Sequence, residues 1–172
     1  GAVPKAVFLA AQFTPDVSED WIKAFATGLK AALEPSGAKL LGGDTVSTPG
    51  PLAFTMTALG HVKTGQALLR SGAHVGDLVL ATGTIGDGAL GLAVLQGELD
   101  NVNPQHAQHL VRRYARPEPR WDFAQELSTR GLATACVDVS DGLVADLSHI
   151  CTTSGVSAVI DAEQVLLSDA AR

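Results

Sequence analysis

The sequence has few basic residues, only two cysteines and no long apolar run, and these shortages exclude several classes of protein. Lys and Arg number 12 against 18 Asp and Glu, so the formal net charge is −6 at pH 7. With no run of Lys or Arg, this balance argues against nucleic acid or an anionic membrane as the main partner. Apolar stretches such as residues 6–11 are far too short to cross a bilayer. No charged segment followed by an apolar core and a cleavage site opens the chain.

The cysteines and histidines show no metal-binding spacing. Cys136 and Cys151 lie in apolar surroundings without a CxxC pair. We expect two buried, reduced thiols, which fits an intracellular, cytoplasmic protein. His106 and His109 fall on one predicted helix, but no acidic residue lies between them and no HExxH spacing occurs. Solvated or hydrogen-bonded histidines are therefore expected.

The composition predicts a folded α/β (α+β) protein. Hydrophobic residues make up 46% of the 172 residues and charged residues 17%, which is enough to build a buried core. Strand, helix, strand and strand are expected first, followed by a mixture of helices and short strands. Residues 63–77 carry few large apolar side chains. We therefore place a domain boundary near Thr64, with parts of two mixed α/β domains over residues 1–64 and 65–172.

Hydrophobic periodicity and turn residues define the expected elements. Strands are predicted over residues 5–13, 39–41, 52–62, 78–81, 134–137 and 156–160. Helices are predicted from the capping residue Ser18 to residue 33, from the glycine-rich residues 82–91 through Leu95, and over residues 103–114, 121–130 and 143–154. Alternation in residues 52–62 predicts one drier face, as in an antiparallel sheet that pairs with a second copy.

Two acidic turns carry the candidate chemistry, and the first is Gly42-Gly43-Asp44-Thr45 after a predicted short strand. Because glycines lack a side chain, a phosphate could approach the backbone N–H groups closely. Asp44 could hold Mg²⁺, a hard cation that prefers oxygen ligands. The alternative is an ordinary turn in which Asp44 bonds its own backbone. Taken alone, the four residues favour the ordinary turn.

The second turn is Asp138-Val139-Ser140-Asp141-Gly142, between a predicted strand and a helix. Asp138 and Ser140 are two positions apart and point to one side, and Asp141 lies at the helix start, where negative charge is favoured. In the alternative interpretation, Asp141 caps the helix and Asp138 is a strand-end turn residue. A cap explains one aspartate but not a second at the end of an apolar strand, where an unpaired charge is costly.

Other polar positions allow two interpretations each. Arg70 could clamp phosphate oxygens with its guanidinium, or it could be a solvated loop arginine. The same holds for the arginines of residues 116–120. Gly86, Gly88 and Gly91 fit the GxGxxG spacing, but no strand ending in an acidic residue follows, as a dinucleotide site needs. We interpret this stretch as a tight strand-to-helix turn.

Taken together and in order, five stretches resemble the thiamine-monophosphate kinase family. They are GGDT at 42–45, GQALLRSGAHVG at 65–76, TGTIGDGAL at 82–90, RPEPR at 116–120 and DVSDGLVADLSHI at 138–150. The wider superfamily includes aminoimidazole ribonucleotide synthetase, selenophosphate synthetase and a hydrogenase maturation protein. The resemblance covers nearly the whole chain. It implies the aminoimidazole ribonucleotide synthetase-like fold, a homodimer, and Mg²⁺-dependent phosphorylation of thiamine monophosphate by ATP.

The resemblance also implies roles for individual residues. Those that would contact ATP are Gly43, Asp44, Arg70 and Ser140. Those that would bind Mg²⁺ are Asp44, Asp138 and Asp141. Asp141 would also be the catalytic residue, near the transferred phosphoryl group. Such a reaction depends on positioning and charge neutralisation, and a phosphate acceptor needs little general-base help, in agreement with the lack of a poised histidine.

The family pattern continues beyond both ends of this sequence. Its early segment supplies further metal-binding aspartates and a substrate histidine, and its late segment supplies a substrate glutamate and an aromatic residue. None of them has a counterpart here, so we expect a central fragment that holds half of a composite site and is inactive alone. Two alternatives stay open. One is another ATP-using member of the superfamily with a different acceptor, and the other is a non-catalytic nucleotide-binding or dimerisation module.

Overall fold

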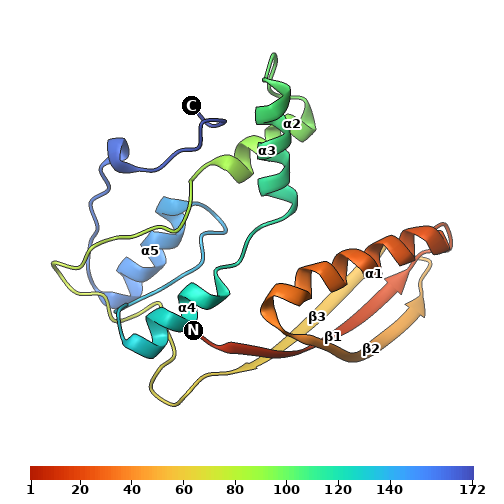
Figure 1. Cartoon of the computed structure of the whole chain (residues 1–172), viewed down its shortest axis with the longest axis horizontal. Helices are drawn as coiled ribbons and strands as arrows, with labels where there is room; N and C mark the ends of the chain where they lie inside the picture. Colours follow the sequence, from red (N-terminus) through yellow and green to blue (C-terminus); the bar gives the residue numbers. More distant parts are fainter. The chain divides into compact units, whose positions relative to one another are not determined.

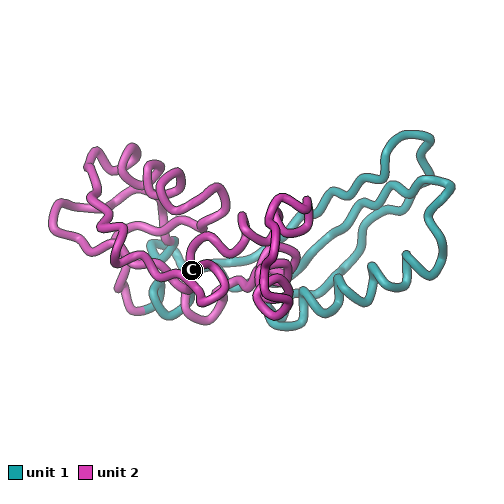
Figure 2. The backbone as a smooth tube through the Cα atoms, turned by 90° about the horizontal axis from the view of Figure 1, so that it is seen from above, with its two compact units in different colours: residues 1–67, 124–129 teal, residues 68–123, 130–172 magenta.

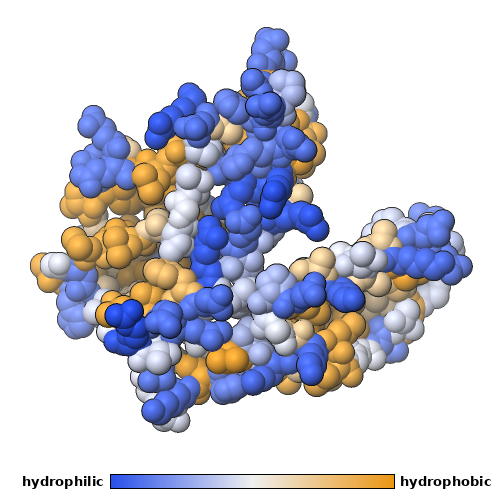
Figure 3. Space-filling model, viewed as in Figure 1, coloured by the Kyte–Doolittle hydropathy of each residue, from blue (hydrophilic) through white to orange (hydrophobic).

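The computed structural model describes all 172 residues, which form two compact units (Figure 2). The first unit holds residues 1–67 and 124–129, and the second holds residues 68–123 and 130–172. Hydrophobic side chains are visible at the surface of both units (Figure 3). None of the helices combines the length and apolar composition that crossing a bilayer requires.

The first unit is a three-stranded sheet with one long helix (Figure 1). Strand β1 (Val3–Phe13) lies in the centre, parallel to β2 (Lys39–Ser47) and antiparallel to β3 (Ala53–His61). Helix α1 (Glu19–Leu33) connects β1 to β2 and runs along one face of the sheet. The strands predicted over residues 5–13 and 52–62 are therefore confirmed, and the pairing of β3 is antiparallel as expected.

Helix α1 begins and ends where its sequence predicts. The Ser18 hydroxyl accepts a hydrogen bond from the Trp21 N–H at 3.2 Å and so caps the first turn. A short 3-10 helix (Glu34–Ser36) and Gly37, which adopts a left-handed conformation, end the helix.

Aromatic side chains fasten α1 to the sheet. Phe25 of α1 stacks on Phe54 of β3 with ring centroids 4.5 Å apart, and Phe13 meets Phe54 edge to face at 5.8 Å. Phe54, on the predicted drier face of β3, thus packs against α1. Met56 on the same face is still 50% exposed, so helix packing covers only part of this face.

The GGDT sequence lies inside β2 and not in a turn after it, so the prediction of a short strand over residues 39–41 is wrong in length. Gly43 pairs with Leu9 of β1, and a Cβ atom at Gly43 would lie only 1.8 Å from the Leu9 carbonyl oxygen. Gly43, one of the two glycines that suggested a turn, instead allows two strand backbones to approach each other closely.

The second unit is built from helices and long connections. It contains α2 (Asp87–Gln96), α3 (Pro104–Ala115), α5 (Leu143–Ser154) and the short 3-10 helix η2 (Ala162–Gln164). Helix α4 (Trp121–Arg130) carries residues of both units. The predicted helix starts at Asn103 and ends at Gly131 and Gly155 agree with the structure, because Asn103 caps α3 and both glycines adopt left-handed conformations.

Helices α2 and α3 approach each other at Gly91. A Cβ atom at Gly91 would lie 2.2 Å from the carbonyl oxygen of Leu110, whose side chain is 1% exposed. The third glycine of the GxGxxG spacing therefore serves helix packing, which agrees with the prediction of a tight turn rather than a dinucleotide site.

The three short strands predicted in the second unit, over residues 78–81, 134–137 and 156–160, are not formed. A strand needs a ladder of backbone hydrogen bonds. Residues 134–137 have a single backbone hydrogen bond to another segment, from the Cys136 N–H to the Leu69 carbonyl at 2.8 Å. Leu78 and Leu80 are 86% and 85% exposed. The apolar character of these residues predicted buried side chains, but no other part of this chain covers them.

Replacing Gly91 with alanine should destabilise the second unit, whereas Gly88→Ala in the same helix should not. The added methyl group at position 91 forces α2 away from α3, at a cost of about 1–3 kcal/mol. Nothing lies within 4 Å of a Cβ atom at Gly88, so that change should be neutral or stabilise by up to about 1 kcal/mol. Denaturant unfolding of both variants measures the difference, and equal midpoints would contradict the close packing.

Candidate functional site

Residues 138–142, called the acidic turn below, lead directly into α5. Asp138, Ser140 and Asp141 are exposed, and Gly142 occupies the N-cap position without a side-chain capping bond. The cap comes instead from Asp146, one turn into the helix. Its Oδ2 atom accepts hydrogen bonds from the N–H groups of residues 140, 141 and 142 at 2.9, 3.0 and 3.1 Å. The alternative in which Asp141 caps the helix is therefore wrong.

Asp146 is a site residue that sequence reasoning missed. Its side chain is 3% exposed, which is rare for a carboxylate without partners. Burial raises the pKa of Asp146, but the hydrogen bonds from the amides of Asp141, Ser140 and Gly142 lower it by more. The pKa of this carboxyl group therefore lies below its usual value. One sequence feature could have indicated it. Asp146 lies in the first turn of an apolar helix whose N-cap residue, Gly142, has no side chain to cap the helix.

Arg70 lies on a segment that is tied to the same helix. The Arg70 carbonyl accepts a hydrogen bond from the Thr153 hydroxyl of α5 at 2.9 Å. The Ser154 hydroxyl accepts bonds from the backbone N–H groups of Gly72 and Ala73 at 3.1 and 3.2 Å. Residues 69–73 thus run beside both the C-terminal end of α5 and the segment that precedes the acidic turn.

Gly43 and Asp44 belong to the first unit. Asp44 is exposed on β2, and its Oδ1 atom accepts a hydrogen bond from the N–H of Thr45 at 2.8 Å. Such a bond to the neighbouring backbone was expected if GGDT formed an ordinary turn, but here it occurs within a strand. Both residues also line a groove of about 400 Å³ between α1 and the sheet. Because Asp44 and the acidic turn lie in different units, a site shared between them stays a prediction.

The glycine-rich turn before α2 is held by a second buried carboxylate. Asp87 is 2% exposed and accepts hydrogen bonds from the hydroxyl groups of Ser168 and Thr84, both at 2.6 Å. His109 Nε2 and Arg113 Nε of α3 lie 3.4 and 3.8 Å from its Oδ2 atom. Burial raises the pKa of Asp87, but the bonds from Ser168, Thr84 and His109 together bring it below its usual value.

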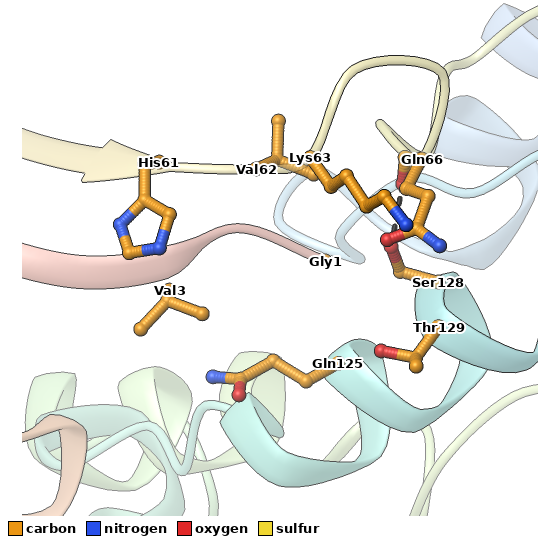
Figure 4. A pocket seen from close by; sticks show the side chains of 9 residues that line it. All are labelled: Gly1, Val3, His61, Val62, Lys63, Gln66, Gln125, Ser128 and Thr129. Carbon is orange, nitrogen blue, oxygen red and sulfur yellow. Dashed lines mark hydrogen bonds between the residues drawn. The ribbon is translucent and has the colours of Figure 1, made fainter.

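A small hollow in the first unit holds none of the predicted site residues (Figure 4). It measures about 210 Å³, and its lining includes His61, Lys63 and the nearly buried Ser128. The Ser128 hydroxyl donates a hydrogen bond to the Gln66 carbonyl. This serine is consequently engaged with the backbone and has no basic partner of the kind that activates a nucleophile.

Comparison with known families accounts for nearly the whole chain. Residues 1–62 match the N-terminal domain of AIR synthase related protein, and residues 74–172 match its C-terminal domain. The chain belongs to the AIR synthase related protein family. The α/β fold class and the synthetase-like fold expected from the sequence are thereby confirmed.

The relatives to which this AIR synthase related protein is similar include thiamine-monophosphate kinases. It is 44% identical to the kinase of Salmonella typhimurium, over 99% of this chain and 51% of that protein. The crystal structure of the Stenotrophomonas maltophilia kinase matches 98% of this chain and 53% of its own, at 40% identity and a TM-score of 0.89. AaThiL, solved in complex with AMPPCP and TMP, matches at 30% identity with a TM-score of 0.87, over 99% of this chain and 53% of its own. The chain spans about half the length of the relatives it matches.

The donors of the acidic turn suit Mg²⁺. The carboxylates of Asp138 and Asp141 and the hydroxyl of Ser140 are hard oxygen ligands, and Mg²⁺ in enzymes that use nucleotides is held by one or two carboxylates together with water and substrate phosphates. No group of three or more His, Cys, Asp or Glu side chains in the chain is placed to hold a metal ion. The acidic turn therefore offers oxygen ligands for a cation whose coordination other ligands would complete.

The ionised form of Asp87 should stabilise the fold in a pH-dependent way. Its pKa in the folded state lies below the unfolded value of about 3.9. The stabilisation is therefore complete above that unfolded value and is lost as the pH falls through the folded pKa. In urea unfolding between pH 6 and pH 2, wild type should lose stability more steeply below pH 4 than Asp87→Asn does. Asp100→Asn, which changes an exposed loop aspartate, should follow wild type, and a parallel curve for Asp87→Asn would contradict the role.

Proposed function

We propose that the protein containing this chain transfers a phosphoryl group from ATP to thiamine monophosphate and forms thiamine diphosphate. The observation that carries the proposal is similarity to thiamine-monophosphate kinases along 99% of the chain. A relative whose structure contains AMPPCP and TMP supports ATP as the phosphoryl donor and TMP as the acceptor. The chemistry of the acidic turn agrees, since phosphoryl transfer needs oxygen ligands for a metal more than it needs a base.

In this proposal the predicted residues keep the roles that the resemblance implies. Those that contact ATP are Gly43, Asp44, Arg70 and Ser140, and those that hold Mg²⁺ are Asp44, Asp138 and Asp141. Asp141 lies nearest the transferred phosphoryl group. Mg²⁺, when bound, offsets the negative charge that develops on that group. The protein residues orient the phosphates, and the guanidinium of Arg70 adds a positive charge that can form two parallel hydrogen bonds.

We further propose a cytoplasmic homodimer with domains over residues 1–64 and 65–172. The gap between the two matched domains, residues 63–73, includes the proposed boundary. Within the first unit α1 packs on one face of the sheet, and both β2 and β3 are edge strands. Phe8 on β1 is still 38% exposed. Open edges and exposed apolar side chains favour association with another copy.

A hybrid enzyme tests this function, with this chain replacing the matching half of the Salmonella typhimurium kinase. With ATP and Mg²⁺ it should convert thiamine monophosphate into thiamine diphosphate, measured by chromatography. Asp138→Asn should lower turnover on the order of 10²-fold or more, because a charged group that stabilises the transition state is lost. Asp161→Asn is the control, since this exposed aspartate accepts hydrogen bonds from Glu163 and Gln164 of the neighbouring η2.

The outcomes separate the alternatives. A hybrid that folds and binds ATP but phosphorylates a different acceptor identifies another activity of the superfamily. ATP binding without any turnover indicates a nucleotide-binding module. Normal kinetics in Asp138→Asn would remove the metal role of this residue.

A further inference from the structure

The acidic turn is fixed from within the protein. Its Asp138, Ser140 and Asp141 are exposed, whereas Asp146 behind it is 3% exposed. Three successive backbone N–H groups, those of residues 140–142, point at one Asp146 oxygen over 2.9–3.1 Å. Successive N–H groups that converge in this way form a concavity that binds anions. Here the anion is a carboxylate of the same chain.

This arrangement changes the charge that the turn presents. A helix N-terminus carries a partial positive charge, which attracts phosphate and disfavours a nearby cation. The Asp146 carboxylate lies in the first turn of α5, bonded to the N–H groups of the residues just before the helix, and offsets that charge. It also occupies the N–H groups of residues 140–142, to which a phosphate could otherwise bind. The exposed side of the turn is left with the carboxylates of Asp138 and Asp141, a combination that attracts cations.

We propose that Asp146 is a positioning residue that makes the acidic turn bind a divalent cation directly and phosphate only through that cation. Its hydrogen bonds set the orientation of three consecutive peptide groups, and these in turn set the directions of the side chains at positions 140 and 141. Asp146 accepts its hydrogen bond from the backbone N–H of Ser140 and not from the hydroxyl. The Ser140 hydroxyl is therefore left for ATP. This inference rests on the proposed function, because that function supplies the cation and the nucleotide.

Amide exchange and Mn²⁺ binding on this chain test the proposal without any turnover. Asp146→Asn keeps an oxygen acceptor and removes the charge, and Asp146→Ala removes both. The matched control is Asp87→Asn, which alters a carboxylate of the same unit that is equally buried and hydrogen-bonded. Hydrogen exchange of amides 140–142 is followed by NMR. Mn²⁺, a paramagnetic substitute for Mg²⁺, is titrated in the presence of a non-hydrolysable ATP analogue while the signals of residues 138–142 broaden.

In Asp146→Ala, exchange of amides 140–142 should accelerate at least about tenfold, since a charge-assisted hydrogen bond is lost at each. The Mn²⁺ dissociation constant should rise by at least about tenfold in both Asp146 variants and stay within about twofold of wild type in Asp87→Asn. Asp146→Asn keeps the test valid if Asp146→Ala does not fold.

Unchanged exchange of the three amides in Asp146→Asn and Asp146→Ala overturns the positioning role. Faster exchange with unchanged Mn²⁺ affinity overturns the link between Asp146 and the cation. If wild type shows no broadening at Asp138 and Asp141 with Mn²⁺, the metal site of the proposed function fails as well. The exchange measurements on the same samples then still decide whether Asp146 holds the turn, so the two failures are distinguishable.

Discussion

Buried carboxylates that accept several hydrogen bonds organise the second unit. Leu110 is the one large apolar side chain of the second unit that is less than 2% exposed. Apolar packing alone therefore contributes little to fixing the conformation of the loops in this unit. Asp87 joins the turn before α2 to the C-terminal segment, and Asp146 joins the acidic turn to α5. A buried charge is tolerated only where hydrogen bonds replace water, and both carboxylates meet that condition. The conformation of the acidic turn follows from the need of Asp146 for hydrogen-bond donors.

The same constraint decides which ligand the acidic turn suits. A helix start with free N–H groups is an anion site, and such a site would bind the phosphates of a nucleotide without metal. Because Asp146 takes up the N–H groups of residues 140–142 before the helix, the turn presents the exposed carboxylates of Asp138 and Asp141 and becomes a cation site. The proposed phosphoryl transfer would benefit from this, because a metal ion can bridge phosphates that a chain with a net charge of −6 would repel.

Much of the fold was predictable from the sequence where local signals coincide. Ser18 with its amphipathic helix, Asn103 before Pro104, and the glycines that end α4 and α5 all act through neighbouring residues. Long-range features were not predictable in this way. The glycines of GGDT indicated a turn, although Gly43 is needed for contact with a strand more than thirty positions away. Apolar residues 78–81 and 156–160 indicated strands, but their state depends on pairing partners that propensity does not reveal. The acidic turn was identified, whereas its anchor Asp146 was missed because its partners are backbone N–H groups, which leave no side-chain pattern in the sequence.

The most direct measurement is a crystal structure of this chain with Mn²⁺ and a non-hydrolysable ATP analogue, with manganese located by its anomalous signal. We expect manganese within coordination distance, about 2.0–2.2 Å, of carboxylate oxygens of Asp138 or Asp141. Phosphate oxygens should lie on the metal, and Asp146 should still accept the three N–H groups of residues 140–142. Phosphate bound directly to those N–H groups, with Asp146 displaced and no metal on the turn, would contradict it.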